Sequence, residues 1–255
     1  MKNFIGIFDS GIGGLTVYNT IKEKFPNENI VYLADTKNCP YGIKKLDEIN
    51  KISVNNINYL KKLGAKAIVV ACNTATSSIN NEINDSDGFI IGVIEPTAKL
   101  AYETSTSKRI GVFATNLTIK TKAYDNYLKD AIVFGEGCSD FVLPIEEGKI
   151  HTEEMKNMIK NHVKALDNVD TLILGCTHFP YIKDEINKII PSVSLIESGE
   201  ATAKYLYKYL KQHDLLDDVK NRELIFLTTN NKEDAFKQLD RLNQKFDVVD
   251  EVRID

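Results

Sequence analysis

The segment Ala67-Ile-Val-Val-Ala-Cys72-Asn73-Thr74-Ala75-Thr76 has a counterpart in Thr171-Leu-Ile-Leu-Gly-Cys176-Thr177-His178-Phe179-Pro180. Each segment is a short apolar run followed by one small residue, a cysteine and then polar residues. A continuous apolar run of this length predicts a strand that is buried on both faces of a parallel sheet. Each cysteine then follows the carboxyl end of a strand, which is where open α/β sheets bind their ligands.

The two segments belong to a longer repeat. Ile5-Gly6-Ile7-Phe8 recurs as Ile110-Gly111-Val112-Phe113, and Ile94-Glu95 recurs as Ile196-Glu197. Together with the cysteines, these pairs keep one order at a spacing of about 100 residues, which predicts an internal duplication. The alternative is that two α/β halves look alike because strands are alike. If duplicated halves face each other, the two thiols meet across one cleft.

Strands and helices are expected to alternate along the whole chain. Strands are expected at 4–8, 30–34, 67–71, 89–94, 110–114, 131–134, 171–175, 193–196, 223–228 and 246–252. Helices are expected at 15–25, 45–63, from about 76, from 95, and at 115–130, 152–166, 181–190, 198–212 and 232–242, with a loop over 135–149. Gly64 should end the second helix, and Ser198 should cap the helix that it opens.

This alternation predicts the α/β fold class, with mainly parallel sheets. We expect two doubly wound α/β domains that are related by the internal duplication. The first domain is predicted to comprise residues 1–95 and 207–255, and the second is predicted to comprise residues 96–206. The active site is predicted to lie in the cleft between the two domains.

The composition is that of an ordinary soluble globular protein, with 43% apolar and 27% charged residues among 255 and a net charge of −4. The charges are interleaved and form no basic stripe, so we expect no nucleic-acid partner. No apolar run approaches the roughly 18 residues of a membrane span, and the N-terminal run is too short for a signal peptide. We therefore expect a cytoplasmic protein with no membrane partner.

A glycine-rich segment, Asp9-Ser10-Gly11-Ile12-Gly13-Gly14, is predicted to join the first strand to the first helix. Such a turn offers backbone N–H groups and a helix N-terminus, which together suit an anion. The alternative is a tight turn that needs glycine for a positive φ. The segment is neither a dinucleotide fingerprint nor a Walker loop. The carboxylate of Asp9 argues against a phosphate and suits an amino group or support of a proton transfer.

Cys72 and Cys176 are candidates for acid–base chemistry. Each precedes a predicted helix start, which lowers the pKa of a thiol from its usual value of about 8.5. A thiolate and a thiol on opposite faces of one carbon can remove a proton and return another, which inverts a stereocentre. Three alternatives are two ordinary buried thiols, a disulfide, and a zinc site with His178 and Asp9.

His178 lies two residues after Cys176 and is a candidate proton partner for that thiol, although a lone histidine is more often structural. Asp9 is the equivalent candidate for Cys72. The remaining cysteines, Cys39 and Cys138, have no matching context and are assigned structural roles. The four cysteines contain no Cys-x-x-Cys pair and do not resemble a disulfide framework, which fits a reducing compartment.

In combination, several motifs resemble those of the glutamate racemase family, within the aspartate/glutamate racemases. These motifs are Asp9-Ser10-Gly11-Ile12-Gly13-Gly14, Pro40-Tyr41-Gly42, Ala71-Cys72-Asn73-Thr74-Ala75, Gly92-Val93-Ile94-Glu95-Pro96, Thr115 with Thr118, and Gly175-Cys176-Thr177-His178-Phe179-Pro180. The resemblance covers almost the whole chain and is weakest after about Tyr205. The histidine of the last motif resembles the residue that glutamate racemases carry at this position, whereas the related aspartate racemases more usually carry another residue.

The resemblance implies an enzyme that interconverts L- and D-glutamate without pyridoxal phosphate or metal and supplies D-glutamate for peptidoglycan. It implies that Cys176 deprotonates the L isomer and Cys72 the D isomer, assisted by His178 and Asp9 respectively. It also implies a fold of two α/β domains with the site between them, and a homodimer.

The resemblance also implies substrate contacts from ten residues: Asp9, Ser10, Tyr41, Gly42, Asn73, Thr74, Thr115, Thr118, Thr177 and His178. A further family glutamate supports the histidine side of the site. Alignment on Phe141 gives this role to Glu146, whereas alignment on Pro144 gives it to Glu147. Two other functions stay open, namely an aspartate racemase and a non-catalytic amino-acid-binding regulatory protein that uses the same cleft.

Overall fold

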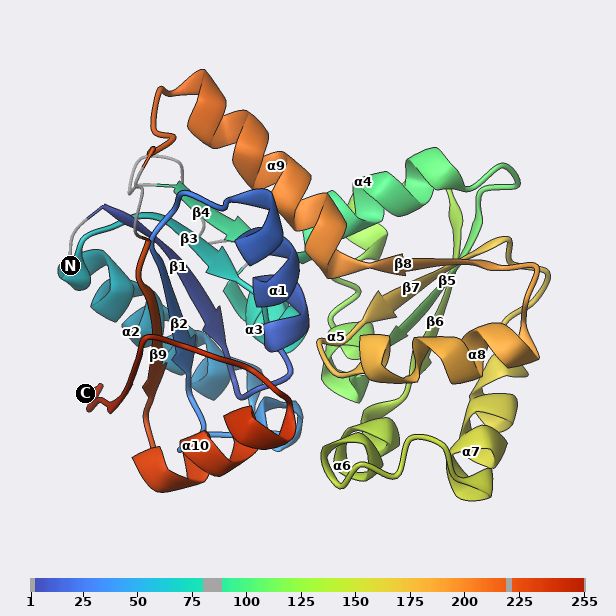
Figure 1. The fold of residues 1–255 in the computed structure, drawn as a ribbon. Helices are drawn as coiled ribbons and strands as arrows, with labels where there is room; N and C mark the ends of the chain where they lie inside the picture. The colour runs from blue at the N-terminus through green and yellow to red at the C-terminus, as the bar shows by residue number, and fades with distance from the viewer. Residues whose placement is uncertain (1–2, 80–88, 219–221, 255) are drawn as a thin grey trace.

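The computed structural model describes residues 3–79, 89–218 and 222–254. The strands of this part of the chain form two sheets, each built from parallel strands, that lie side by side (Figure 1). The order of the first sheet is β10 (Val248–Glu251), β9 (Leu224–Thr228), β2 (Ile30–Ala34), β1 (Phe4–Asp9), β3 (Ala65–Val70) and β4 (Phe89–Gly92). The order of the second sheet is β6 (Ile132–Gly137), β5 (Arg109–Ala114), β7 (Thr171–Gly175) and β8 (Ser194–Glu197).

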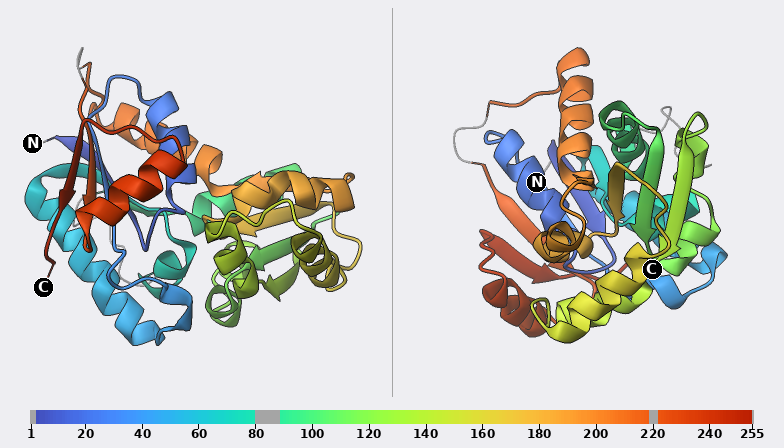
Figure 2. Two further views of the ribbon diagram at one scale, coloured as in Figure 1. Left: turned by 60° about the horizontal axis from the view of Figure 1, so that its bottom comes forward. Right: turned by 90° about the vertical axis from the view of Figure 1, so that its right-hand side faces the viewer.

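Helices cover both faces of both sheets (Figures 1 and 2). The first sheet lies between α1 (Leu15–Lys24), α9 (Ser198–Gln212) and α10 (Lys232–Arg241) on one face and α2 (Leu46–Leu63) and α3 (Asn73–Ile79) on the other. The second sheet lies between α6 (Val142–Glu146), α7 (Glu153–Val163) and α8 (Lys183–Ile189) on one face and α4 (Ile94–Thr104) and α5 (Asn116–Lys120) on the other. The prediction of two doubly wound α/β units is confirmed.

The central strands carry apolar residues in succession because both of their faces are buried. In β1, Ile5 and Ile7 point into the core beneath α1 and α9, whereas Phe4 and Phe8 point into the core beneath α2. Burying each of these side chains contributes about 1.5–3 kcal/mol to folding. Because the strands of each sheet are parallel, their carboxyl ends lie at one edge of that sheet, and Cys72 and Cys176 follow two of these ends.

The predicted duplication is visible in the topology. The order β2-β1-β3-β4 of the first sheet recurs as β6-β5-β7-β8 in the second. The register also recurs, because Phe8 lies opposite Val70 and Phe113 lies opposite Leu174. Strands β3 and β7, which precede the two cysteines, therefore occupy equivalent positions.

The chain crosses from the second sheet back to the first through α9 (Figure 1). From Ala203 onward, α9 packs into the core of the first sheet with Leu206 and Leu210. We propose the division into residues 1–95 with 207–255 and residues 96–206, in which the second crossing falls within this helix. In the part of the chain that the structure describes, no helix combines the length and the apolar composition needed to cross a bilayer.

Several sequence expectations were wrong in detail. The helix expected over 115–130 ends at Lys120, since Lys122 adopts a φ of 52°. The loop expected over 135–149 contains the end of β6, the short helix η4 (Ser139–Phe141) and α6, because β6 continues to pair with β5 as far as Gly137. Ser198 is the first residue of α9 rather than its cap, and Glu197 precedes it without a side-chain cap bond.

Other boundaries are close to the expected ones. α3 begins at Asn73, three residues before the expected start, and any continuation past residue 79 lies outside the described residues. The helix expected over 181–190 is a short helix η5 (Phe179–Ile182) followed by α8. Two further short helices are η1 (Tyr41–Ile43) and η3 (Asp125–Tyr127).

Gly64 ends α2 with a φ of 98°, as the sequence predicts, and its N–H bonds back to carbonyl oxygens of the last turn. An alanine in this left-handed conformation costs roughly 1–2 kcal/mol. We expect Gly64→Ala to lower the midpoint of urea unfolding, whereas Gly64→Asn should lower it less because asparagine tolerates the same φ. Equal midpoints for the two variants would contradict this assignment.

Candidate active site

A cavity of about 410 Å³ lies at the carboxyl ends of the strands, with walls from both sheets. Cys72 and Cys176 both line it, although they come from different sheets. All four cysteines, which include Cys39 and Cys138, are free thiols, so the disulfide alternative is wrong. Among the described residues, no group of three or more His, Cys, Asp and Glu side chains could hold a metal ion.

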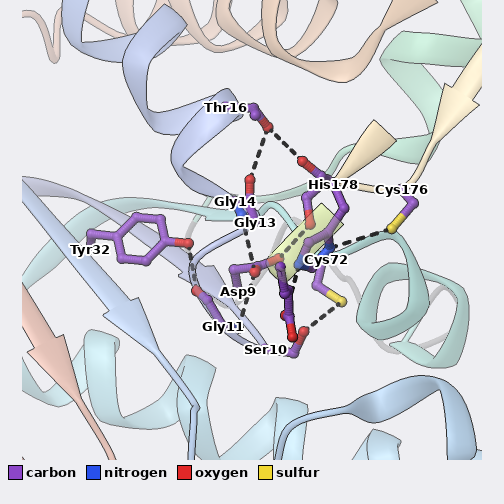
Figure 3. Close-up of polar contacts among 12 residues, drawn as sticks. Asp9, Ser10, Gly11, Gly13, Gly14, Thr16, Tyr32, Cys72, Cys176 and His178 are labelled. Carbon is purple, nitrogen blue, oxygen red and sulfur yellow. Dashed lines mark hydrogen bonds and ion pairs between the residues drawn. The ribbon is translucent and has the colours of Figure 1, made fainter. Parts of the chain in front are cut away.

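Cys72 lies between the end of β3 and the start of α3. The backbone N–H of Ala75 donates to its sulfur over 3.4 Å. Its thiol donates to Ser10 Oγ over 3.7 Å (Figure 3). Burial, reinforced by the charge of Asp9, raises the pKa of the Cys72 thiol to about 12. This direction is opposite to the lowering expected from the helix start, because the desolvation of a buried thiolate outweighs the helix N–H groups. Cys72 is therefore a neutral thiol near neutral pH.

Cys176 follows the last residue of β7, and its sulfur lies 3.7 Å from Nδ1 of His178 (Figure 3). The other ring nitrogen, Nε2, lies 3.0 Å from Oε1 of Glu146 in α6. Burial by itself would lower the pKa of His178. The hydrogen bonds to Cys176 and Glu146 have the larger combined effect and raise this pKa to about 10. His178 is thus cationic near neutral pH and donates from both nitrogens, which places a positive donor against one thiol of the pair.

Glu146 and Glu147 occupy different environments. The hydrogen bond to His178 lowers the pKa of Glu146, so this carboxyl group is ionised. Glu147 instead forms an ion pair of 2.6 Å with Lys149 on the surface. Of the two glutamates that the sequence left open, it is Glu146 whose side chain contacts the histidine.

The glycine-rich segment binds the carboxylate of its own Asp9. The backbone N–H groups of Gly11 and Gly14 donate to Asp9 Oδ2 over 3.0 and 3.1 Å (Figure 3). The anion site inferred from this segment is therefore occupied by an intrachain ligand. Burial raises the pKa of Asp9, although the positive charge of His178 and the two N–H groups oppose that effect.

Gly13 and Gly14 of this segment are needed for close approach rather than for a positive φ, so the tight-turn alternative was wrong in its reason. Their φ values are not in the left-handed region, which among described glycines is adopted by Gly64 and Gly148. A Cβ on Gly14 would lie 2.6 Å from the Cβ of Asp9, and a Cβ on Gly13 would lie 2.6 Å from Thr177 Oγ1. These distances exclude any side chain at either position unless the neighbours move.

Polar contacts join the two sheets around the cavity. Thr16 Oγ1 bonds to the carbonyl oxygen of Thr177 over 3.1 Å, and Thr74 Oγ1 lies 3.0 Å from Thr115 Oγ1. On the same boundary, the hydroxyl of Tyr124 donates to Asn73 Oδ1 over 2.7 Å. These bonds set the separation of the two strand ends that carry the cysteines.

The structure gathers most of the predicted site residues. The predicted residues that line the cavity are Ser10, Tyr41, Gly42, Cys72, Asn73, Thr74, Thr115, Glu146, Cys176, Thr177 and His178. Asp9 and Thr118 do not line it. Asp9 is fully buried beneath the glycine-rich segment, and Thr118 Oγ1 lies 2.9 Å from Thr115 Oγ1.

Sequence reasoning missed six lining residues: Cys39, Pro40, Ile43, Ser139, Val142 and Leu143. The first three adjoin the predicted Tyr41 and Gly42, so their position beside that motif was an available signal. The other three belong to η4 and α6, which were expected to be a loop. Cys39 therefore lines the cavity, while Cys138 lies in the core of the second sheet.

Comparison with known proteins gives a consistent result. A family model described as Asp/Glu/Hydantoin racemase matches residues 5–206. A glutamate racemase of Aquifex aeolicus is 45% identical over 211 residues, which cover 81% of this chain and 83% of that protein. A crystal structure of a glutamate racemase isoform from Bacillus anthracis has a TM-score of 0.91 and 31% identity, and the match covers 99% of this chain and 97% of that one.

A further solved structure is the glutamate racemase of Francisella tularensis in complex with D-glutamate. It has a TM-score of 0.90 and 32% identity, and the match covers all of this chain (100%) and 98% of that one. The chain therefore belongs to the Asp/Glu/hydantoin racemase family and is an isomerase with glutamate racemases among its relatives.

Proposed function

We propose that this protein interconverts L- and D-glutamate by a two-cysteine acid–base mechanism without a cofactor or metal. The observation that carries the proposal is that two free thiols line one cavity from equivalent strand ends of two sheets. The relative that binds D-glutamate supports the choice of substrate. In the cell the reaction would supply D-glutamate for peptidoglycan, in the cytoplasm and from a homodimer.

In the direction from L- to D-glutamate, Cys176 would remove the Cα proton as a thiolate. Cationic His178 supports this role because its Nδ1 can donate to the sulfur, and Glu146 holds the ring in that orientation. Hydrogen bonds to both ring nitrogens fix the rotation of the imidazole. General bases of this kind depend mainly on alignment with the proton that they abstract.

Cys72 would return a proton to the opposite face of Cα. Its raised pKa favours this role, since a neutral thiol is ready to donate. The negative charge of buried Asp9 raises the pKa of Cys72. It therefore disfavours a thiolate at Cys72 in addition to the one at Cys176. In the reverse direction the two cysteines exchange roles, and the same geometry serves both isomers.

The polar residues of the cavity would hold the substrate. Asn73 is the clearest case, because its Oδ1 accepts from Tyr124 while its buried Nδ2 has no hydrogen-bond partner among the described residues. A buried, unpaired donor costs roughly 1–3 kcal/mol, which a carboxylate oxygen of glutamate would recover. We assign Ser10, Gly42, Thr74, Thr115, Thr177 and His178 to the same contact set, together with the backbone of Tyr41, and we place Asp9 and Thr118 behind it as supports.

The proposal is tested by incubating L-glutamate with the purified protein in heavy water, with pyridoxal phosphate absent. We expect deuterium at Cα of the product and formation of the D isomer. Binding of glutamate without exchange would instead indicate an amino-acid-binding protein. Faster turnover of L-aspartate than of L-glutamate would indicate an aspartate racemase.

In the variant Glu146→Gln, we expect the activity to decline at a lower alkaline pH than in the parent protein. Glu146 helps to raise the pKa of His178 to about 10, so His178 in the parent protein stays cationic up to that pH. Without the carboxylate, the pKa of His178 falls and the imidazolium loses its proton at a lower pH. We expect the alkaline limb of kcat/KM to shift to lower pH in this variant.

The matched control is Glu147→Gln, which removes a carboxylate of the same length from the surface pair with Lys149. Its pH profile should coincide with that of the parent protein. If the two variants give the same profile, Glu146 does not act through His178.

A further inference from the structure

Asp35, which directly follows β2, is a buried carboxylate outside the catalytic cavity, and its side chain is only 1% exposed. Four side chains donate hydrogen bonds to it. The donors are Asn38 Nδ2 at 3.0 Å, the Tyr41 hydroxyl at 2.5 Å, Asn56 Nδ2 at 3.1 Å and Thr229 Oγ1 at 2.7 Å. A buried carboxylate with this many donors is a rigid centre, because each lost bond would leave a charge unpaired.

Tyr41 connects this carboxylate to the catalytic cavity. The residue lines the cavity, while its hydroxyl points away to donate to Asp35 and to accept from Asn56 Nδ2 over 3.2 Å. The ring is 2% exposed and packs against Phe8. Burial, together with the charge of Asp35, raises the pKa of Tyr41, so the hydroxyl keeps its proton and remains a donor. The hydroxyl is therefore an anchor for the Tyr41-Gly42 turn rather than a group for the substrate.

One of the donors comes from the C-terminal segment of the chain. Strand β9 pairs with β2, and the backbone N–H of Thr229 donates to the carbonyl oxygen of Ala34 over 3.1 Å. This places Thr229 beside Asp35, although 194 positions separate them in the sequence. The family model ends at residue 206, so Thr229 lies beyond the part of the chain that it matches.

We propose that Asp35 is a positioning residue that, with Asn56 and Thr229, holds the Tyr41-Gly42 turn against the catalytic cavity and so sets the affinity for the substrate. The inference rests on the proposed function, because it assigns this turn to the substrate contacts. None of the three residues lines the cavity or contacts either cysteine. The anchor should therefore affect KM far more than the proton transfers that determine kcat.

The first test compares Asp35→Asn, Tyr41→Phe and the double variant by steady-state kinetics on L-glutamate. Asp35→Asn replaces a charged acceptor by an amide, and Tyr41→Phe removes only the hydroxyl. Each should raise KM about tenfold with kcat close to that of the parent protein. Because both changes break one interaction, the double variant should show little further rise in KM. Additive effects, or a fall in kcat at constant KM, would overturn the proposal.

The second test uses Thr229, so that the proposal stays testable even if Asp35→Asn fails to fold. Thr229→Val keeps the shape of the side chain but loses the hydroxyl, whereas Thr229→Ser keeps the hydroxyl. We expect KM to rise in the valine variant and to return to the parent value in the serine variant. A rise in both variants, or in neither, would show that the hydrogen bond to Asp35 has no part in substrate affinity.

A control variant distinguishes the hydrogen bonds of Asp35 from the second cavity that Asp35 borders. Asp35, Asn56 and Thr229 also border a second cavity of about 420 Å³, whose wall includes exposed Arg253. Arg253→Ala changes this wall without touching the carboxylate and should leave KM unchanged. If the parent protein does not racemise glutamate, the proposed function fails. If it does and the Asp35, Tyr41 and Thr229 variants keep its KM, only the present inference fails.

Discussion

Replacing either cysteine of the pair by serine is expected to abolish most of the racemisation. Cys72→Ser and Cys176→Ser should each lower the rate by about 10²–10⁴-fold in both directions, the usual contribution of one general acid or base. A serine hydroxyl is a far weaker acid than a thiol, so it can neither carry the anion that takes the proton nor readily give a proton back. Because every turnover uses both groups, the loss of either one stops inversion.

The measurement is the initial rate of D-glutamate formation from L-glutamate, and of the reverse reaction, with circular dichroism to confirm the fold. Cys39→Ser is the matched control, since Cys39 lines the same cavity but lies on neither proton path. We expect its rates to stay close to those of the parent protein. Near-normal racemisation by either of the other serine variants would remove the two-cysteine mechanism.

Gly13→Ala is expected to give the second large effect, although position 13 carries no reactive group. Its Cβ would lie 2.6 Å from Thr177 Oγ1 and 2.7 Å from Cε1 of His178, two residues that follow β7 of the opposite sheet. The two strand ends would have to separate, and His178 would move relative to Cys176. A displacement of about 1 Å in a reacting geometry costs roughly 100-fold in rate, and we expect kcat/KM to fall by that factor.

Gly11→Ala is the control for this change within the same segment. A Cβ there would meet only the sulfur of Cys39, at an ordinary contact distance of 3.5 Å, and the N–H that bonds to Asp9 would remain. Its kcat/KM should fall far less than that of Gly13→Ala. Similar losses in both variants would mean that the segment tolerates no side chain for reasons other than contact with His178.

The comparison of Asp9 with Cys72 shows where local patterns mislead. A glycine-rich turn before a helix indicates an anion site, and the site exists, but the anion that it holds is the carboxylate of Asp9. A cysteine before a helix start indicates an acidic thiol, yet burial raises the pKa of Cys72. In both cases the local feature is present, but its effect depends on the surrounding structure. The anion site is filled by Asp9, and the pKa of Cys72 is raised rather than lowered.

The amino-acid sequence by itself determined the alternation of strands and helices, the duplication, and the position of each cysteine at the end of a strand. These features depend on short-range periodicity and on residue types that are close together in the chain. Only the tertiary structure decided that Glu146 rather than Glu147 contacts His178, that Gly13 approaches Thr177 and His178, and that Thr229 reaches Asp35. The physical reason is that such contacts join segments far apart in the chain, so they depend on how strands pair and how the two sheets pack.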